Sequence, residues 1–395
     1  GYFLFAVPSN RVLEKVGARR WIARIMVSWG LISMAFMFTG AVHWGPIAPA
    51  FGCTDAEFTF YLLRFLLGVT EAGFYPGVIL YLTYWFPAAR RAQMVALFMS
   101  AIAASNLIGS PLSGLIMQHM DGIADWRGWQ WLFLLDGCPS GVVGVVILFA
   151  LPDGPRQARW LSAAERDIVV RTLEADETHK RASGSRHRLV EAFTDFRVWA
   201  LALVYFCGAA CFYAVSFWMP TIIQEFGVGA TDYLRIGLLN MVPWGIAAIF
   251  MVLWARRSDR TGERRWHASG ALVIAMVGML MLMLVGQSPL LSLLALALVT
   301  AGTLGWVVTF WSIPTAFLTG TAAAAGIAWI SAMGKRWGHF AADIACRIRT
   351  DSGGASEAAF LTLAVSALIG AVVMALLPLP QTGQRPATRA PNEAL

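Results

Sequence analysis

The chain has 395 residues, of which 58% are hydrophobic and only 13% are charged. A soluble globular protein carries about 25% charged residues, so this composition excludes an ordinary soluble fold and indicates a polytopic membrane protein. The net charge of +7 comes from basic residues in short segments between apolar runs, where orientation signals belong. It therefore does not indicate a nucleic-acid-binding protein.

Apolar runs of about twenty residues, long enough to span a bilayer, recur along the whole chain. The first run, 1–13, is shorter and resembles the C-terminal part of a helix, so we expect N-terminal sequence to be missing. The full-length candidates are 21–42, 58–86, 92–118, 129–151, 198–224, 234–255, 267–286, 289–311, 314–342 and 357–379. These runs predict an all-α polytopic membrane protein.

One polar segment divides the apolar runs into two groups. Residues 152–197 are rich in Arg, Glu and Asp, and part of this segment has the pattern of a soluble amphipathic helix. We therefore expect an N-terminal bundle at 1–151, a central loop at 152–197 and a C-terminal bundle at 198–379. A polar, proline-containing tail follows at 380–395.

The basic residues predict the orientation of the spans. The loop before 21–42, the loop before 267–286 and the central segment are basic, whereas 43–57 contains no Lys or Arg. Basic loops stay on the cytoplasmic side, so the central loop and the C-terminus of this multi-pass protein are expected there. The first partial helix then runs inward, and a cytoplasmic N-terminus requires one more helix upstream.

Two loops share an unusual sequence. EKVGARRW, Glu14 to Trp21, recurs as DRTGERRW, Asp259 to Trp266. Both copies enter a predicted span, as expected for parallel repeats in a transporter. Positive-inside anchoring explains the arginines but not the repeated acid and glycine, so we favour a cytoplasmic gate. Its candidate residues are Glu14, Gly17, Arg19, Arg20, Asp259, Arg260, Gly262, Arg264 and Arg265.

The run 58–86 contains only two charged residues, Arg64 and Glu71. Residues seven apart on an α-helix lie about 20° apart around the axis and roughly 10 Å apart along it. Each charge at membrane depth costs roughly 2.5–3.5 kcal/mol, so such residues usually face a protein interior or a water-filled cavity. The pair predicts a binding and proton-relay face. The alternative for Arg64 is that its side chain reaches the membrane interface.

The repeated loops resemble the signature that follows the second and eighth helices in the major facilitator superfamily. The match is partial, because Asn10 replaces the first Gly of the signature and Glu14-Lys15 replaces Asp-Arg. VGARRWIARIMVSWGLIS, RFLLGVTEAGFYPGVILYLTYWFP and GWQWLFLLDG resemble the anion:cation symporter family within that superfamily. The resemblance implies two pseudo-symmetric six-helix bundles, with the first helix and part of the second missing from this chain. Members take up organic anions such as phthalate, tartrate, hydroxyphenylacetate and sugar acids.

The resemblance also implies roles for the two charges. Arg64 matches the fourth-helix Arg linked to the substrate carboxylate, and Glu71 matches the Glu linked to proton coupling. The residue types suit these roles: a guanidinium binds a carboxylate bidentately. A carboxyl at membrane depth is able to load and release a proton near working pH. Gly73 and its neighbouring Gly and Pro residues are expected to bend this helix.

Four further residues are candidates for substrate binding. Asn106 precedes GSPLSG, a segment that resembles the packing element of the family's fifth helix, and is a candidate for facing the cavity. Tyr213 and Trp218 are candidates for an aromatic-lined pocket, although aromatic residues on membrane helices more often pack. Ser331 replaces an Asn of the family's eleventh helix. That helix also departs from the family at Lys335 and Arg336.

The sequence and the resemblance together therefore predict a secondary active transporter of the cell inner membrane that imports a small organic anion by cation (proton) symport with alternating access. The alternative is a non-transporting membrane sensor or an inactive transporter fragment. We expect no enzyme, cofactor or metal, since the five cysteines lack metal-ligand spacing and no nucleophile elbow or phosphate loop is present. The expected partners are the anion, a proton or other cation and the lipid bilayer, but no nucleic acid, and we expect a monomer.

Overall fold

The structure is a computed structural model. It describes residues 5, 9, 12, 16–182, 195–224, 229, 231–284, 288–314, 326–327, 329–331, 333–334 and 357–378. Every regular element in these residues is a helix. The chain forms two compact units: Gly1–Gly184 with Gly227–Met241, and Ser185–Phe226 with Val242–Leu395. We call them the first unit and the second unit.

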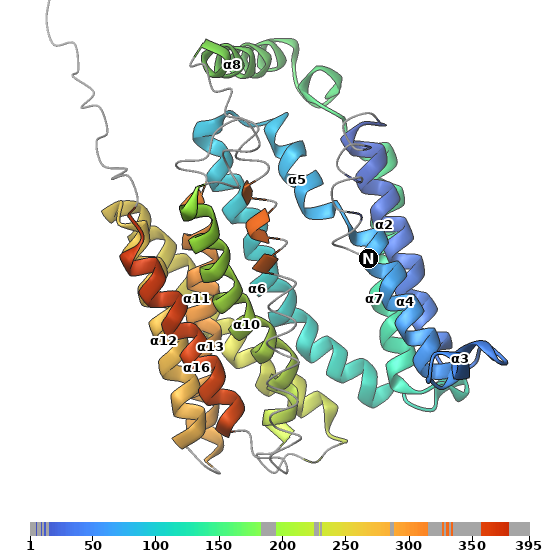
Figure 1. Cartoon of the computed structure of the whole chain (residues 1–395). Helices are drawn as coiled ribbons and strands as arrows, with labels where there is room; N and C mark the ends of the chain where they lie inside the picture. Colours follow the sequence, from blue (N-terminus) through green and yellow to red (C-terminus); the bar gives the residue numbers. More distant parts are fainter. Residues whose placement is uncertain are drawn as a thin grey trace, which may run out of the picture. The chain divides into compact units, whose positions relative to one another are not determined.

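The helices of the first unit are α2 (Ala18–Ala35), α3 (Ile47–Ala50), α4 (Asp55–Glu71), α5 (Phe74–Thr83), α6 (Ala88–His119), α7 (Gly128–Ala150) and α8 (Ala163–Ala182). Three short 3-10 turns accompany them: η1 (Phe36–Phe38), η2 (Ile123–Asp125) and η3 (Pro155–Gln157). The second unit contains α10 (Phe196–Gln224), α12 (Arg264–Leu284), α13 (Pro289–Phe310) and α16 (Glu357–Leu376) (Figure 1). The helix α11 (Tyr233–Thr261) contributes its first residues to the first unit and the rest to the second.

Within the described residues, eight helices are long and apolar enough to cross a membrane: α2 with η1, most of α6, and α7, α10, α11, α12, α13 and α16. They correspond to eight of the predicted runs. The predicted run 58–86 is not one continuous helix, because it forms two helices, α4 and α5. Most of the predicted span 314–342 lies outside the described residues.

Glycines bring α2 and α7 into close backbone contact. A Cβ atom on Gly30 would lie 2.6 Å from the Gly141 nitrogen and 2.7 Å from the Gly137 oxygen, and Gly144 faces Val27 in the same way. Since lipid provides no hydrophobic drive for helices to associate, small residues that permit close van der Waals packing are the usual solution. The Gln130 side chain also donates a 2.7 Å hydrogen bond to the Met37 carbonyl.

The GSPLSG segment of α6 makes a second glycine contact in the first unit. A Cβ atom on Gly114 would meet the Tyr233 carbonyl oxygen, and a Cβ atom on Gly237 would lie 2.5 Å from the Ser110 carbonyl oxygen. The Asn240 amide donates a 2.8 Å hydrogen bond to the Ser110 hydroxyl. The segment therefore packs closely against the start of α11, which is the structural role expected from its small residues.

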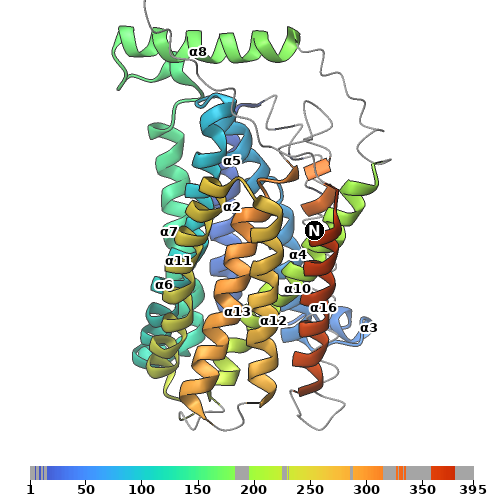
Figure 2. The same ribbon diagram turned by 90° about the vertical axis from the view of Figure 1, so that its left-hand side faces the viewer.

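The core of the second unit is aromatic and tightly packed. Trp306 is buried, and its ring lies 5.4 Å from the rings of Tyr205 and Phe310. Gly208 makes room for the Trp306 indole. In Figure 2, α12, α13 and α16 lie side by side, and the Ser269 hydroxyl ties α12 to α16 by donating to the Ala371 carbonyl at 2.8 Å.

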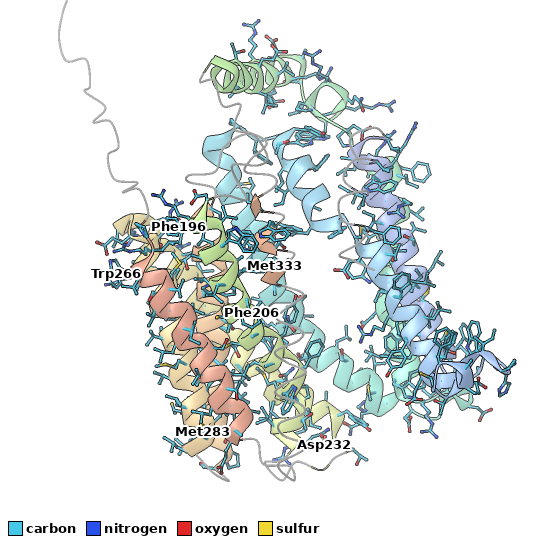
Figure 3. All side chains as sticks on the ribbon, viewed as in Figure 1. Phe196, Phe206, Asp232, Trp266, Met283 and Met333 are labelled. Atoms are coloured by element: carbon cyan, nitrogen blue, oxygen red, sulfur yellow. The ribbon has the colours of Figure 1, made fainter. Side chains whose placement is uncertain are left out.

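Two large aromatic side chains are exposed at one end of the second unit. Figure 3 shows Phe196 and Trp266 at one end and Met283 at the other. Phe196 and Trp266 are 58% and 54% exposed. Aromatic residues at the ends of membrane helices are typical of the membrane–water interface.

The polar helix expected in the central segment is present as α8. Its N-terminus has a capping arrangement, since the Ser162 hydroxyl donates to a Glu165 oxygen at 2.8 Å and the Glu165 N–H donates back to the Ser162 oxygen at 3.3 Å. Arg156 of η3 forms a 2.7 Å ion pair with Glu174 of α8. Just before α8, the Trp160 ring stacks on Trp85 at 5.7 Å.

Candidate functional site

Arg64 is an exposed residue in the third turn of α4. Its guanidinium carbon lies 5.2 Å from the centre of the Phe60 ring and 5.8 Å from that of Phe36. Both distances are within the range of cation–π attraction. In the described part of the chain Arg64 makes no hydrogen bond or ion pair, so its N–H donors are available to an anion.

Glu71 is the last residue of α4 and is partly buried. It lies two helical turns after Arg64, roughly 10 Å along the axis. The helix stops immediately after it: Ala72 leaves the helical conformation with ψ 120°, and Gly73 has φ +94°, a left-handed conformation that favours glycine. Figure 1 shows the change of direction from α4 to α5. The bend predicted for this segment is confirmed, and it is a complete break.

The break is held by a buried hydrogen-bond chain. The Ala72 carbonyl accepts a 2.6 Å hydrogen bond from the Ser9 hydroxyl, and the Ser9 oxygen accepts one of 3.0 Å from the Trp21 indole N–H. A carbonyl freed by a helix break inside a membrane needs such a partner, because no water is available to it. Ser9 and Trp21 thus stabilise the backbone one residue beyond Glu71.

Asn106 lies on α6, in the same unit as Arg64 and Glu71, and is partly buried. Its side-chain amide donates a 2.8 Å hydrogen bond to the Ile102 carbonyl one turn earlier. This bond uses one N–H of the amide and leaves the side-chain oxygen as an acceptor. The substrate contact predicted for Asn106 remains a prediction.

The remaining binding candidates belong to the second unit. The Tyr213 ring contacts Phe212 at 5.7 Å and Phe217 at 6.3 Å. Trp218 lines a small crevice whose lining residues are all apolar, so this crevice does not suit a carboxylate. Ser331 is partly buried and helical, whereas Lys335 and Arg336 lie outside the described residues. Roles for Tyr213, Trp218 and Ser331 in binding remain predictions.

The first copy of the repeated loop is tied to the end of α7. Gly17 has φ +95°, and the backbone N–H of Arg19 donates a 2.9 Å hydrogen bond to Asp153, three residues after α7 ends. The Arg19 side chain approaches the same carboxylate at 3.8 Å. Arg20 is exposed, and Glu14 lies outside the described residues.

The second copy is tied to the ends of α13 and α16. Gly262 again has a left-handed conformation, with φ +71°. The Arg264 side chain donates a 3.3 Å hydrogen bond to the Ser312 carbonyl, and Arg265 donates one of 3.2 Å to the Leu377 carbonyl. Cations are favourable at helix C-termini, where carbonyls lack helical partners.

Arg264 also lies 3.7 Å from Asp259, the acid of its own loop, while Arg260 is exposed. Each described copy therefore anchors its loop to helix ends of its own unit. The left-handed turn explains the glycine that both copies share. Action of the two loops as a cytoplasmic gate remains a prediction.

Sequence reasoning missed three residues that contact the candidate sites. Asp153 holds Arg19, and its only signal is an acid immediately after the apolar run of α7. Phe36 and Phe60 contact Arg64, but in apolar runs they look like any other packing residue. Among the described residues, no group of three or more His, Cys, Asp or Glu side chains is arranged to hold a metal ion.

The comparison with known families decides the identity. The family model described as "Major Facilitator Superfamily" matches residues 1–342. The chain belongs to the major facilitator superfamily. It is therefore a membrane transporter and not an enzyme, and its apolar helices are the multiple transmembrane helices of that family.

Two relatives and one solved structure illustrate the placement. A protein of Agrobacterium vitis named "Putative tartrate transporter" is 44% identical over 381 residues, covering 96% of this chain and 83% of the relative. The inner membrane transport protein RhmT of Escherichia coli is 34% identical over 375 residues, covering 94% and 81%. The xylose transporter XylE of E. coli, solved in a partially occluded inward-open conformation, matches with a TM-score of 0.71 at 14% identity, covering 97% and 86%. The likeness to XylE shows the fold.

Proposed function

We propose that this transporter imports a small organic anion that carries a carboxylate, and that a proton or another cation enters with it. The observation that supports this most directly is the arrangement on α4. An arginine without a hydrogen-bond partner in the described residues and a carboxylate two turns away lie on one helix, and the helix breaks at the carboxylate.

In this proposal Arg64 binds the substrate carboxylate. The guanidinium stays charged at any working pH and offers paired N–H donors that match the two oxygens of a carboxylate. Glu71 carries the coupled proton, because a carboxyl group can alternate between its charged and neutral forms. The helix break after Glu71 would allow α4 and α5 to move separately as the protein alternates access between the two sides of the membrane.

The names of the relatives guide the choice of substrate and location. Because the Agrobacterium vitis relative is named for tartrate, L-tartrate is the first compound to test. The name of RhmT supports an inner-membrane location. The distribution of basic residues supports a cytoplasmic position for residues 152–197 and 380–395.

The substrate role of Arg64 is tested by binding. A thermal-shift screen of carboxylates, beginning with L-tartrate, should give stabilisation in the wild type and none in the Arg64→Ala variant. Arg24→Ala is a matched control, because Arg24 is another exposed arginine of the first unit that lies 4.0 Å over the ring of a tryptophan, Trp21. Undiminished stabilisation of Arg64→Ala would contradict the proposal.

The coupling role of Glu71 is tested in proteoliposomes. Glu71→Gln should abolish accumulation driven by a pH gradient but preserve exchange of labelled for unlabelled substrate, because exchange requires no net proton movement. Glu57→Gln serves as control, since Glu57 belongs to the N-terminal cap of the same helix. Normal pH-driven accumulation in Glu71→Gln would show that the proton is carried elsewhere.

The alternative prediction, a non-transporting sensor or inactive fragment, rested on the departures from the family's eleventh helix, such as Lys335 and Arg336, and on the expected loss of N-terminal sequence. Residues 335–347 lie outside the described part of the chain, so the structure adds nothing in its favour. Flux measurements decide between the two functions. A sensor would bind the carboxylate with no uptake and no exchange, whereas a transporter would show at least exchange.

A further inference from the structure

Three aromatic residues from three different segments form a cluster, which we call the aromatic shelf: Phe36 in η1, Phe60 in α4 and Phe133 in α7. Phe36 is 1% exposed and stacks on Phe133 with ring centres 4.9 Å apart and planes inclined by 16°. The Phe60 ring meets the Phe36 ring edge-on, with ring centres 5.5 Å apart and planes inclined by 77°. The shelf is therefore fixed by packing among three segments of the first unit.

The guanidinium of Arg64 lies beside this shelf, with two ring faces within 6 Å. A ring attracts a cation through its quadrupole and has no lone pairs that accept hydrogen bonds from the cation's N–H groups in the way that a carboxylate does. A carboxylate partner would compete with a substrate for those N–H groups. The shelf can hold the cation in place and leave its donors unused.

We propose that the aromatic shelf pre-orients Arg64 for a carboxylate, so that Phe60 and Phe36 are positioning residues of the anion site. This inference rests on the proposed function, because it deepens the role of Arg64 in substrate binding. An arginine that is free to rotate loses side-chain entropy when it binds a ligand. Prior immobilisation avoids that loss, which corresponds to about a 2- to 10-fold gain in affinity.

Phe60 is the better residue to perturb. Phe36 is buried and packs on Phe133 of α7 as well as on Phe60, so replacing it would also damage the helix packing. Phe60 is only partly buried and lies on the same helix as Arg64, one turn earlier. Phe58 provides a matched control, because it is also partly buried on α4 and contacts Trp44 and Phe51 but no cation within the described residues.

The experiment is a fluorination series at position 60 of the whole protein. Phenylalanine is replaced in turn by its 4-fluoro, 3,5-difluoro and 3,4,5-trifluoro forms, which nearly keep the shape of the ring but weaken its attraction for a cation. Two quantities are measured: the dissociation constant for L-tartrate, and the rate at which phenylglyoxal modifies Arg64, followed by peptide mass spectrometry. The melting temperature is recorded for each protein.

If the aromatic shelf positions Arg64, both measured quantities should change step by step along the fluorination series. The dissociation constant should rise with each added fluorine, to about 2- to 10-fold in the trifluoro protein, and Arg64 should be modified progressively faster. The melting temperature should stay constant, and the same series at Phe58 should change neither quantity. A purely structural role of Phe60 would give no such graded response.

The two readouts separate failure of the shelf from failure of the proposed function. If neither the dissociation constant nor the modification rate of Arg64 changes across the series at position 60, the aromatic shelf does not position Arg64, whatever the substrate. If the wild type does not bind L-tartrate, or if Arg64→Ala binds it normally, the proposed substrate role is contradicted. The modification rate then still decides whether the shelf holds the guanidinium, because phenylglyoxal requires no substrate.

Discussion

Replacing Gly137 by Ala should destabilise the first unit through a contact that the structure defines. The added Cβ atom would lie 2.8 Å from the Gly30 oxygen and 2.9 Å from the Met34 nitrogen, both in the backbone of α2. Backbone atoms cannot rotate aside, so α2 and α7 must separate by several tenths of an ångström. Overpacking of this kind costs about 1–3 kcal/mol.

Part of that cost is offset, because alanine is a better helix former than glycine by up to about 1 kcal/mol. A net loss of about 1–2 kcal/mol corresponds to a fall in melting temperature of roughly 2–8 °C for a unit of this size. Differential scanning fluorimetry of the detergent-solubilised protein measures this shift.

Gly141→Ala is the matched control, one turn further along α7. A Cβ atom there meets nothing within 4 Å, so this variant gains helix propensity without a clash. Its melting temperature should equal or slightly exceed that of the wild type. Equal melting temperatures for the two variants, or a larger loss in Gly141→Ala, would refute the close packing of α2 on α7.

Three further predictions concern the loops and α8. Ser162→Ala should accelerate amide hydrogen exchange in the first turn of α8. Hydrogen bonds from the Ser162 hydroxyl and backbone N–H lower the pKa of Glu165. In the wild type, protection from exchange should therefore be full above the ordinary carboxyl pKa and be lost as the pH falls through the lowered pKa of Glu165. Arg265→Ala removes the partner of the Leu377 carbonyl and should lower the melting temperature by a few degrees, whereas Arg260→Ala should change it little; the reverse order would contradict the helix-end role. A membrane-impermeant maleimide added to intact cells should label a variant whose only cysteine is Cys53, because the loop 43–57 is predicted to be outside, and labelling only after lysis would invert the topology.

The transmembrane helices could be read from the sequence because the property that defines them, a long apolar run, is local. The break between α4 and α5 was less visible. A two-residue turn at Ala72 and Gly73 leaves mean hydropathy almost unchanged, so 58–86 reads as one span. Its glycines indicate a bend, but the position of the break depends on Ser9, which supplies the hydrogen bond to the freed carbonyl from 63 residues away.

The candidate site was predictable to the same limited extent. Arg64 and Glu71 stand out because charges are rare and costly in apolar segments. The aromatic residues around Arg64 do not stand out, because any phenylalanine in an apolar run is equally suited to packing. Only the folded chain brings Phe36 beside Arg64. Asp153 is 134 residues from Arg19, and no local pattern connects them.

The hydrogen bond between Trp21 and Ser9 gives the two similar loops different consequences. Trp21 closes the first loop motif, and through Ser9 it reaches the peptide group next to Glu71. Its counterpart in the second motif, Trp266, contacts the guanidinium of Arg265, whose own bond goes to the end of α16. Both loops are anchored to helix ends, but in the described residues only the first is also connected to the backbone one residue beyond Glu71. The two copies of one sequence motif therefore connect to different parts of the protein.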